Sequence, residues 1–405
     1  MADALKPVSD DDLRQEVRAW LAANWHMKVA DLNEFRTTPA YREWLNKVVD
    51  ARWAAPRWPV EWFGRAMSDE QGYIIEQEFN RVGAPGSGMD RTQLYANTAL
   101  AYGTPELKQA VIPGILRGEI AMCLLYSEPG AGSDLAAVRT RAEDNGAGWT
   151  VNGQKIWTSS AATADYGMLV ARTDWDKPKH QGLSFFFLPM KQKGVEVRPL
   201  RQITNESHFN EVFFTDAKVP RENLLGKLGE GWKVLQTALA YERSAMGERA
   251  RGPRRAGADA ADSDLIALAR RSGKLNDPAF RQELARTIAY RQLNELNTAR
   301  AKAGLEQSSS SSIMSLGKLA MSRILHEEAR LRTAMLGAES MLQGAEHQLA
   351  DDANFLSLNA YFTSIGGGTD QIQRNIISER VLGMPKEQEV DRNIPFRSVR
   401  TEKAT

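Results

Sequence analysis

The feature that most constrains the fold of this chain is a hydrophobic period that changes twice along its 405 residues. Apolar residues recur at helical spacing through residues 1–120. Residues 122–228 show short β-type runs separated by turn residues, and the helical period returns at Gly231 and lasts almost to the end. The order helix, strand, helix predicts an α+β chain. The domains expected are an N-terminal helical domain at 1–121, a middle antiparallel β domain at 122–229 and a C-terminal helical domain at 230–405.

Start and stop residues predict where the helices lie. Ser9 is a candidate N-cap ahead of acidic residues, and Thr104 with Pro105 gives a cap followed by a first-turn proline. The helices expected span 9–25, Pro39 to Val49, Ser68 to Val82, a segment that begins at Thr104, Trp232 to Arg249, Asp264 to Ser272, Pro278 to Ala303, Ile313 to Gly344 and Gln371 to Leu382. Gly252 to Asp262 and the serine run Ser308 to Ser312 are expected to be connections.

The middle region predicts an antiparallel sandwich or barrel. Its clearest turn is Asn152-Gly153, which lies between Trp149 and Trp157 and predicts a hairpin of two short strands. Further strands are expected at Gly167 to Arg172, Leu183 to Met190, Val195 to Arg198 and Glu211 to Asp216.

Composition excludes several classes of protein. Apolar residues make up 42% and charged residues 25%, which is typical of a globular protein with a sizeable core. The net charge of +1 gives no electrostatic basis for binding nucleic acid or an anionic membrane. Cys123 is the only cysteine, so we expect neither an internal disulfide nor a cysteine-ligated metal. No apolar run approaches the roughly 18 residues of a membrane span, and no secretory or transit pattern is visible, so a cytoplasmic location is expected.

Three stretches combine glycines, hydroxyls and aromatic residues. The first is Tyr126 to Asp134 (YSEPGAGSD), called the glycine loop below. Its small residues would let backbone N–H groups approach a flat or phosphorylated ligand, although an ordinary tight turn also explains them. Lys155 to Ser160 places Trp157 beside hydroxyls, either to face a cofactor or to plug the β domain. Ile365 to Arg374 runs a triple glycine into a helix start that suits an anion or is simply capped.

A carboxylate on an apolar helix face is the candidate for acid–base chemistry. Leu235, Leu239 and Glu242 fall at positions i, i+4 and i+7, so Glu242 lies on the apolar stripe of its helix. Burial would raise the pKa of that carboxyl unless a cation neutralised it. The residue pattern alone leaves two interpretations, a structural ion pair and a base that abstracts a proton.

Together these motifs resemble the acyl-CoA dehydrogenase family. The matching segments are Ser-Glu-Pro-Gly-Ala-Gly-Ser-Asp near residue 130, Asn-Gly-Gln-Lys-Ile-Trp near residue 155 and Gly-Gly-Thr-Asp-Gln-Ile-Gln-Arg near residue 370. The resemblance extends over essentially the whole chain, in the family's order and spacing. It implies a C-terminal four-helix bundle, FAD as the cofactor, and oxidation of an acyl-CoA thioester to the 2-enoyl-CoA, with an electron-transfer flavoprotein as the acceptor.

The resemblance also implies roles for individual positions. The residues that would hold FAD are Leu124, Tyr126, Ser127, Gly132, Ser133, Trp157, Thr158, Ser159, Gly344, Thr369 and Gln371. The residues that would contact acyl-CoA are Ser133, Tyr241, Arg243, Gly367 and Gly368. Ser159 falls where the family forms a hydrogen bond near flavin N5. Thr369 and Gln371 fall where the family's helix start meets the FAD diphosphate and ribose.

The chain departs from the family at the position of the base. Many members carry the catalytic glutamate immediately before the Gly-Thr pair, and here that position is Gly367. A subset that includes isovaleryl- and long-chain acyl-CoA dehydrogenases places the base on the first helix of the C-terminal domain, followed by arginine. Glu242 and Arg243 match that arrangement. The resemblance therefore implies that Glu242 removes the α-proton and that flavin N5 takes the β-hydride.

Two further departures concern the contacts between subunits. The family's Arg-x-x-Phe-Gly segment is matched by Ile313 to Gly317, which has no arginine, and the family's glutamine before its glycine pair appears as Ser340. The family usually forms a homotetramer built as a dimer of dimers, and the resemblance implies that assembly here. The two losses leave open an alternative in which the chain is one subunit of a hetero-oligomer. The residues are also compatible with a flavin oxidase or monooxygenase on the same fold, or with a scaffold without activity.

Overall fold

The structure is a computed structural model that describes residues 9–29, 31–249, 257–305 and 314–399; the side chains of 33, 242–249, 257–263, 301–305 and 314 are outside that description. The described residues form two compact units. The first unit comprises residues 9–200, 207–249 and 390–399, and the second comprises 201–206, 257–305 and 314–389.

The N-terminal part of the first unit is helical, as predicted. Its helices are α1 (Asp10–Asn24), α2 (Leu32–Phe35), α3 (Pro39–Asp50), α4 (Asp69–Arg81), α5 (Met89–Thr92), α6 (Leu94–Tyr102) and α7 (Pro105–Leu116). Ser9, Ser68 and Thr104 act as the N-caps of α1, α4 and α7, because each side chain accepts a hydrogen bond from a backbone N–H in the first turn. Helix α8 (Gly231–Arg249) follows the sheet in the chain and packs against α6 and strand β5.

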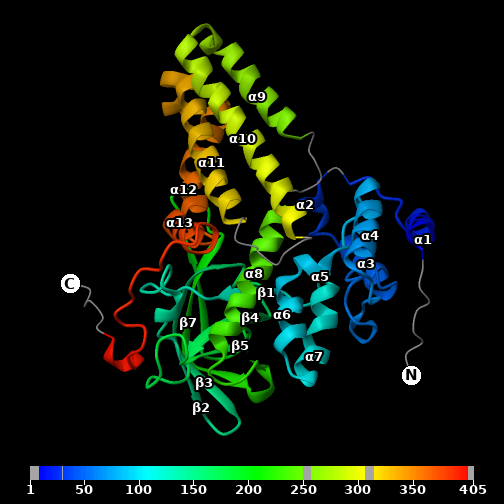
Figure 1. Cartoon of the computed structure of the whole chain (residues 1–405), viewed down its shortest axis with the longest axis vertical. Helices are drawn as coiled ribbons and strands as arrows, with labels where there is room; N and C mark the ends of the chain where they lie inside the picture. The colour runs from blue at the N-terminus through cyan, green and yellow to red at the C-terminus, as the bar shows by residue number, and fades with distance from the viewer. Residues whose placement is uncertain (1–8, 30, 250–256, 306–313, 400–405) are drawn as a thin grey trace. The chain divides into compact units, whose positions relative to one another are not determined.

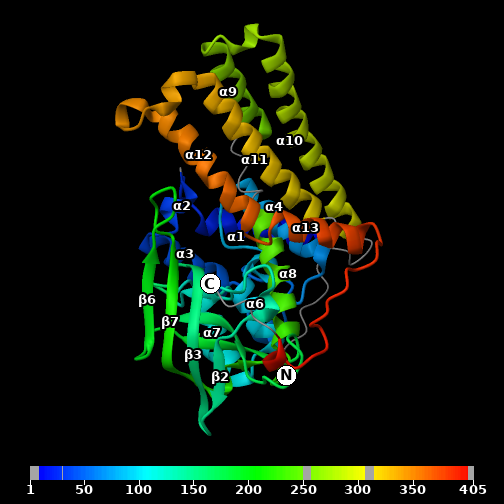
Figure 2. The same ribbon diagram turned by 90° about the vertical axis from the view of Figure 1, so that its left-hand side faces the viewer.

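The middle of the first unit is one sheet of eight strands. The strands are β1 (Met122–Leu125), β2 (Arg141–Asp144), β3 (Gly148–Ser159), β4 (Tyr166–Arg172), β5 (Leu183–Pro189), β6 (Val195–Leu200), β7 (Phe209–Pro220) and β8 (Leu224–Leu225). They pair in the order β6-β7-β3-β2-β4-β5-β8, and Figure 2 shows β6, β7, β3 and β2 side by side. Most pairs are antiparallel, as predicted, while β1 and β2 run parallel to β4.

The hairpin predicted at Asn152-Gly153 is wrong. Both residues lie inside β3, which is continuous and has an irregular register with β7 at this point. Asn152 is held by Asp216 of β7 through two hydrogen bonds, one from its amide to the Asp216 carboxylate (3.0 Å) and one from the Asp216 N–H (2.9 Å). The turn lies instead between β2 and β3, where the side-chain carbonyl of Asn145 accepts hydrogen bonds from the next residues. An Asn-Gly pair thus serves here as a bulge.

Replacing Gly153 by alanine is expected to lower the free energy of unfolding by about 2 kcal/mol or more, because backbone strain and a close contact with Thr140 both oppose the added Cβ. Gly153 has φ = 149°, and an added Cβ would lie 2.6 Å from Oγ1 and 2.8 Å from Cα of Thr140. Gly146→Ala is the matched control, since Gly146 also has positive φ (86°) but nothing within 4 Å of an added Cβ. Urea unfolding measures the free energy of unfolding of the two variants. Equal losses of stability in Gly153→Ala and Gly146→Ala would contradict the role given to Gly153 in the bulge.

The second unit is helical in its described residues. Its elements are α9 (Gly257–Arg271), α10 (Pro278–Leu305), α11 (Met314–Leu336), α12 (Gln348–Ile365) and α13 (Asp370–Ile376), which continues as a π-turn at Ile377–Val381. Figure 1 shows α9 to α12 as long helices that lie alongside one another, and α11 contacts both α10 and α12.

Two sequence predictions about helices need correction. The connection expected at Gly252 to Asp262 is wrong from Gly257 onward, because α9 begins there, and its first part lies outside the described residues, as does the serine run Ser308 to Ser312. Helices α6 and α12 were missed. In α12 the apolar residues surround the helix, as Phe355, Leu356 and Leu358 show, so no single stripe marks it.

Candidate active site

The glycine loop is a closed turn that follows β1. Glu128 and Ala131 exchange both backbone hydrogen bonds (3.0 Å each), which places Pro129 and Gly130 at the tip. Gly130 and Gly132 have open space around them, since an added Cβ at either would meet nothing within 4 Å. Ser133 is exposed. The loop therefore presents backbone and a hydroxyl that a ligand can approach closely.

A buried ion pair that the sequence analysis missed anchors this loop to β3. Lys155 has no accessible surface, and its Nζ lies 2.8 Å from the Glu128 carboxylate and 2.9 Å from the Tyr126 carbonyl. The same carboxylate accepts hydrogen bonds from the backbone N–H groups of Arg139 (2.6 Å) and Thr140 (2.8 Å). Glu128 thus ties the start of the loop to its end.

The charges of this pair reflect opposing effects. Burial opposes ionisation of Glu128, but the Lys155 charge and the three hydrogen bonds outweigh it, so the pKa of Glu128 is lowered. Burial lowers the pKa of Lys155, and the attraction of Glu128 only partly offsets that effect. The pair connects the glycine loop to β3.

The end of β3 lies directly beside the loop. The N–H of Ile156 donates a 2.9 Å hydrogen bond to the Ser127 carbonyl. The next residue, Trp157, has φ = 61° and is 55% exposed, with its indole edge-on to Phe209 at 5.8 Å between ring centroids. A left-handed backbone at a non-glycine residue costs about 1–3 kcal/mol and is found mainly where function requires it. The structure therefore places an exposed, strained tryptophan next to the glycine loop.

The other predicted residues of this region differ in exposure. Ser159 is exposed, whereas Thr158 between it and Trp157 is buried. The Thr158 carbonyl accepts from Asn210 (2.9 Å), and its hydroxyl has no partner among the described residues. Tyr126 is buried edge-on to Phe185, and Leu124 is half-buried in β1. Trp157 and Ser159 thus form the accessible side of the strand end.

Helix α8 carries the predicted base. Leu235 and Ala238 are fully buried, and Leu239 packs on the same core, which confirms an apolar face at this helical spacing. Tyr241 is half-buried, and burial together with nearby Tyr102 raises the pKa of its phenol. The backbone of Glu242 and Arg243 continues α8, while their side chains are outside the described residues.

The triple glycine forms a sharp entry to α13 in the second unit. Gly367 and Gly368 have φ of 66° and 88°, and Thr369 caps the helix by accepting from the N–H of Ile372 (3.2 Å). Gln371 is exposed. The Gly367 carbonyl accepts from the Gln373 amide (3.0 Å), which fixes the glycine turn. Thr369 is thus the N-cap of α13, which agrees with the capped helix that the sequence left open as one of two interpretations.

The family models identify this combination of elements. Acyl-CoA dehydrogenase models match in chain order, the N-terminal domain over residues 9–119, the middle domain over 123–217 and the C-terminal domain over 229–382. The chain belongs to the acyl-CoA dehydrogenase family. The family's fold, with helical terminal domains around a middle sheet, is the one predicted.

Individual relatives of this acyl-CoA dehydrogenase agree. The chain is 36% identical over 396 residues to the acyl-CoA dehydrogenase IpdE1 of Mycolicibacterium smegmatis, covering 93% of this chain and 98% of the relative. A solved structure named the Tcur3481-Tcur3483 steroid ACAD is 28% identical, with a TM-score of 0.71 over 95% of this chain and 100% of the other. The ChsE4-ChsE5 complex from Mycobacterium tuberculosis is 27% identical, with a TM-score of 0.67 over 96% of this chain and 100% of the other.

Acyl-CoA dehydrogenases use FAD, and the residues of the first unit fit a flat cofactor. Trp157 presents an exposed indole, and Gly130 and Gly132 leave the loop backbone open to close approach. Ser133 and Ser159 add exposed hydroxyls on either segment. Thr158 differs, because its buried side chain leaves only its backbone for such a role.

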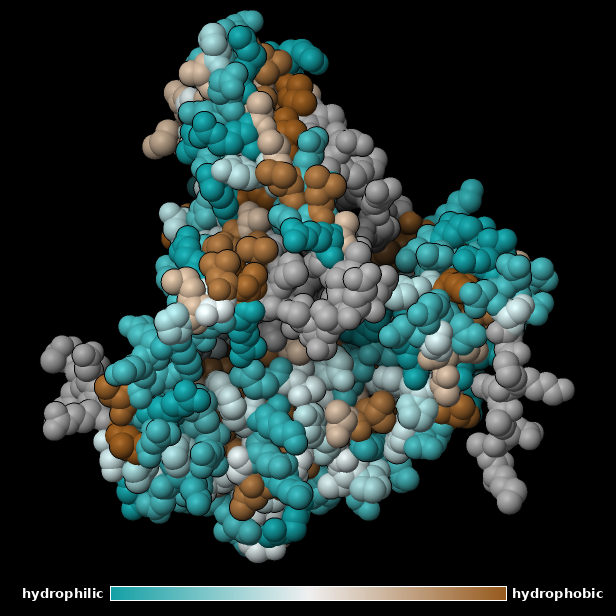
Figure 3. Space-filling view, in the orientation of Figure 1, coloured by the Kyte–Doolittle hydropathy of each residue, from teal (hydrophilic) through white to brown (hydrophobic). Residues whose placement is uncertain are grey.

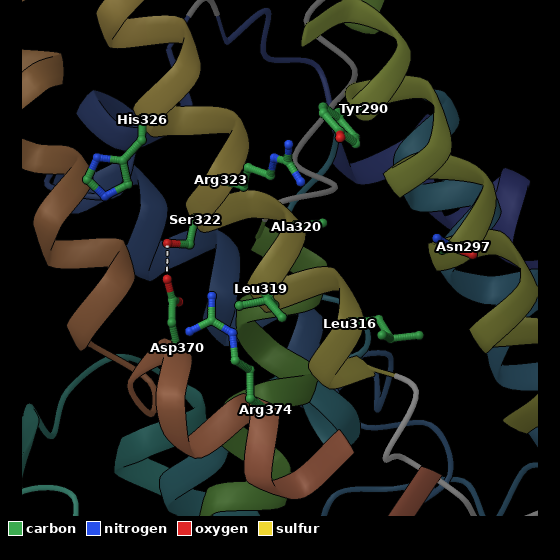
Figure 4. Close-up of a pocket in the computed structure, with 10 residues that line it drawn as sticks. All are labelled: Tyr290, Asn297, Leu316, Leu319, Ala320, Ser322, Arg323, His326, Asp370 and Arg374. Atoms are coloured by element: carbon green, nitrogen blue, oxygen red, sulfur yellow. Dashed lines mark hydrogen bonds between the residues drawn. The ribbon is translucent and has the colours of Figure 1, made fainter. Parts of the chain in front are cut away.

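A cavity of about 590 Å³ lies beside α13 in the second unit (Figure 4). Its lining residues are Tyr290, Asn297, Leu316, Leu319, Ala320, Ser322, Arg323, His326, Asp370 and Arg374. Asp370 is neutralised by Lys318 (3.1 Å) and accepts from Ser322 (2.8 Å). Arg323 stacks on Tyr290 at 4.2 Å, and neither Arg323 nor Arg374 has an ion pair within the described residues. The cavity is therefore positively charged.

None of the predicted site residues lines that cavity, although Thr369 and Gln371 flank Asp370. Gly344 lies elsewhere, in a turn where its N–H donates to the Asp351 carboxylate (3.1 Å). The two arginines of the cavity come from α11 and α13, and nothing in their sequence positions distinguishes them from surface residues. Ile313 lies outside the described residues.

The described residues offer neither a metal site, nor a membrane-spanning helix, nor a reactive thiol. No group of three or more His, Cys, Asp and Glu side chains there is arranged to hold a metal ion. No described helix combines the length and apolar character that crossing a bilayer requires. Cys123 is buried, and burial raises the pKa of its thiol to about 12, so it is not a reactive thiolate.

Proposed function

We propose that this chain catalyses the FAD-dependent α,β-dehydrogenation of an acyl-CoA thioester, with Glu242 as the base. Acyl-CoA dehydrogenation in the broad sense follows from the family. The observation that carries the finer proposal is the junction of the glycine loop with β3, where the Ile156–Ser127 hydrogen bond sets an exposed Trp157 beside an open glycine backbone. Bound FAD would accept the hydride from the β-carbon.

The residues of the chain have distinct roles in this proposal. Within the first unit, the residues that would contact FAD are Leu124, Tyr126, Ser127, Gly132, Ser133, Trp157, Ser159 and the backbone of Thr158. Within the second unit, taken by itself, the candidates for FAD contacts are Gly344, Thr369 and Gln371. The Trp157 indole would exclude water from the bound cofactor, and the exposed hydroxyls would orient it. Ser133, Tyr241, Arg243 and Gly368 contact the acyl-CoA.

Proton removal requires a base and a stabilised enolate. Glu242 would serve as the base, because its position in the sequence continues the i, i+4, i+7 stripe that Leu235 and Leu239 begin. Burial at such a position would raise the pKa of a carboxyl. The N–H of Gly367 would donate to the thioester oxygen, since glycine keeps the backbone donor although it lacks a side chain. One such donor typically contributes about 3–4 kcal/mol to transition-state stabilisation.

We further propose a bulky, ring-bearing acyl group. The support is the position of the base on α8 and the likeness to a structure named a steroid ACAD. A ring system needs a wide apolar pocket. With the base on α8, the position where many family members carry the catalytic glutamate is Gly367, which has no side chain to occupy that space. The flavin-bleaching screen described below identifies the acyl group.

Assembly and electron acceptor belong to the same proposal. We propose an oligomer, either a homotetramer or a hetero-oligomer such as the ChsE4-ChsE5 complex, with an electron-transfer flavoprotein as the acceptor in the cytoplasm. Apolar side chains are visible on the face of the second unit that Figure 3 shows. In that unit Leu296, Tyr361 and Ile365 are each more than half exposed. Apolar side chains exposed in this number favour a protein–protein contact.

Bleaching of the bound flavin tests the function. The purified chain is expected to be yellow and to lose its visible absorbance on mixing with its acyl-CoA, across a screen of short, long, branched, aromatic and steroid thioesters. A colourless protein with no affinity for FAD, alone and with a co-expressed partner, would contradict the proposal. Peroxide release in place of reduction of an artificial acceptor would assign an oxidase instead.

A further inference from the structure

The segment 390–399, here called the C-terminal strap, packs on the first unit although the residues just before it belong to the second. The Phe396 N–H donates to the Lys177 carbonyl and the Arg397 N–H to the Trp175 carbonyl, both at 3.0 Å. The Arg397 side chain also bonds the Asp176 carboxylate (2.6 Å). Two backbone hydrogen bonds and an ion pair thus dock the strap on the connection between β4 and β5.

Phe396 covers a buried arginine that holds the end of the glycine loop. Its ring is 1% exposed and lies 3.4 Å from the Arg172 guanidinium carbon. Arg172 is fully buried and donates to the carbonyls of Ala136 (2.7 Å) and Val138 (3.2 Å), which follow the loop directly. Burial lowers the pKa of Arg172 to about 10. Phe396 therefore keeps water from an arginine whose hydrogen bonds hold the segment that follows the loop.

A second contact links the strap to the loop through a lysine. Lys179 Nζ lies 3.0 Å from the carboxylate of Asp134, the last residue of the glycine loop, and 3.3 Å from the carboxylate of Asp391 in the strap. Lys179 is 6% exposed, so this bridge is largely shielded from solvent. The Lys179 carbonyl in turn accepts from Arg172 (3.2 Å). The two anchors of the strap thus share one hydrogen-bonded cluster.

We propose that the C-terminal strap is a positioning element of the cofactor site, in which Phe396 and Asp391 act through Arg172 and Lys179 to hold the glycine loop in its binding conformation. The inference rests on the proposed function, because it assigns FAD to that loop. Glu128 fixes the start of the loop through Lys155 of β3, and the strap reaches its last residue, Asp134, through Lys179. Loss of the strap loosens residues 134–140 and weakens FAD binding.

Paired truncations test this proposal. Ending the chain after Glu389 removes the strap, whereas ending it after Val399 retains it. In the FAD-free protein, amide hydrogen exchange over residues 126–140 is expected to be about tenfold faster in the shorter chain, with exchange in β6 and β7 unchanged. The dissociation constant for FAD, measured by quenching of flavin fluorescence, is expected to rise about tenfold, because a loosened first contact shell costs affinity.

Point variants keep the test decisive if the shorter chain fails to fold. Phe396→Ala and Asp391→Asn are expected to reproduce the faster exchange at residues 126–140. Phe396→Trp, which retains an aromatic ring, is expected to keep the slow exchange of the unaltered chain. Val390→Ala, at a side chain 94% exposed, is expected to leave exchange unchanged. Two results would overturn the proposal. Uniformly faster exchange throughout the sheet would mean that the strap stabilises the whole unit, and unchanged exchange at residues 126–140 would mean that it does not hold the loop. If no chain binds FAD, the proposed function fails while the exchange result still decides the coupling.

Discussion

Glutamine at position 242 is expected to abolish turnover while the protein keeps its flavin. Glu242→Gln retains the size and hydrogen-bonding capacity of the side chain on α8 but cannot accept the α-proton. Loss of a general base typically lowers the rate by about 10²–10⁴-fold, so the flavin should stay oxidised for many minutes after mixing with acyl-CoA. Stopped-flow absorbance measures the rate constant of flavin reduction, and equilibrium titration of FAD measures whether binding is unchanged.

Glu248 provides the matched control, because it is the other glutamate of α8 and the proposal gives it no role. Glu248→Gln is expected to reduce the flavin at the wild-type rate. A Glu242→Gln enzyme that bleaches normally would sink the assignment of the base. Loss of FAD from that variant would indicate instead that Glu242 has a structural role, the second interpretation that the apolar position of a carboxylate leaves open.

The order of helices and strands could be predicted from the sequence because the relevant patterns are local. Ser9 and Thr104 each cap a helix at the predicted residue, since a hydroxyl before an amphipathic run satisfies first-turn N–H groups whatever the tertiary context. Strand β4 lies within one residue of its predicted bounds for a similar reason. A continuous apolar run of that length is buried on both faces.

Two failures of the fold prediction, the hairpin at Asn152-Gly153 and the missed helix α12, arose where tertiary contacts determine the structure. Asn152-Gly153 is a strong hairpin pattern, yet strands β2 and β7 lie on either side of it and the Asp216 carboxylate bonds Asn152, so the chain continues as a strand. Helix α12 lacks a polar face, and its partners, rather than its own period, stabilise it. Neither contact can be read from neighbouring residues.

The site was only half predictable. The glycine loop and Trp157 were identified from residue types, and the structure places them side by side through the Ile156–Ser127 hydrogen bond. The groups that hold them were missed, because Lys155 and Arg172 read as charges on strands and their burial depends on the sheet order. A lysine at a strand position between half-buried neighbours gives no indication of a carboxylate 27 residues earlier.

Removing the Lys155 charge is expected to destabilise the first unit by about 3–5 kcal/mol, because Lys155→Met leaves a buried carboxylate without its cation. Glu128 would keep its two backbone donors but lose its closest positive charge. The glycine loop should loosen with it, so FAD binding is expected to weaken in parallel. Urea unfolding and FAD titration measure the two effects. Lys191→Met is the matched control, since Lys191 pairs with Asp165 at an exposed site, where such pairs contribute about 0–1 kcal/mol.

The pH dependence separates the ion pair from simple packing. The pKa of Glu128 is lowered in the folded state, so its stabilisation is complete above the unfolded value near 4.5 and is lost as the pH falls through the lower folded value. In Lys155→Met burial dominates and raises that pKa, so the midpoint of acid unfolding should move to higher pH. Glu128→Gln in the same background removes the buried charge and should recover part of the lost free energy. Two results would contradict this account: an acid-unfolding midpoint in Lys155→Met that does not change, or a double variant that is less stable than Lys155→Met alone. Either would mean that Lys155 acts through the packing of its aliphatic chain. The backbone donors alone would then hold the loop.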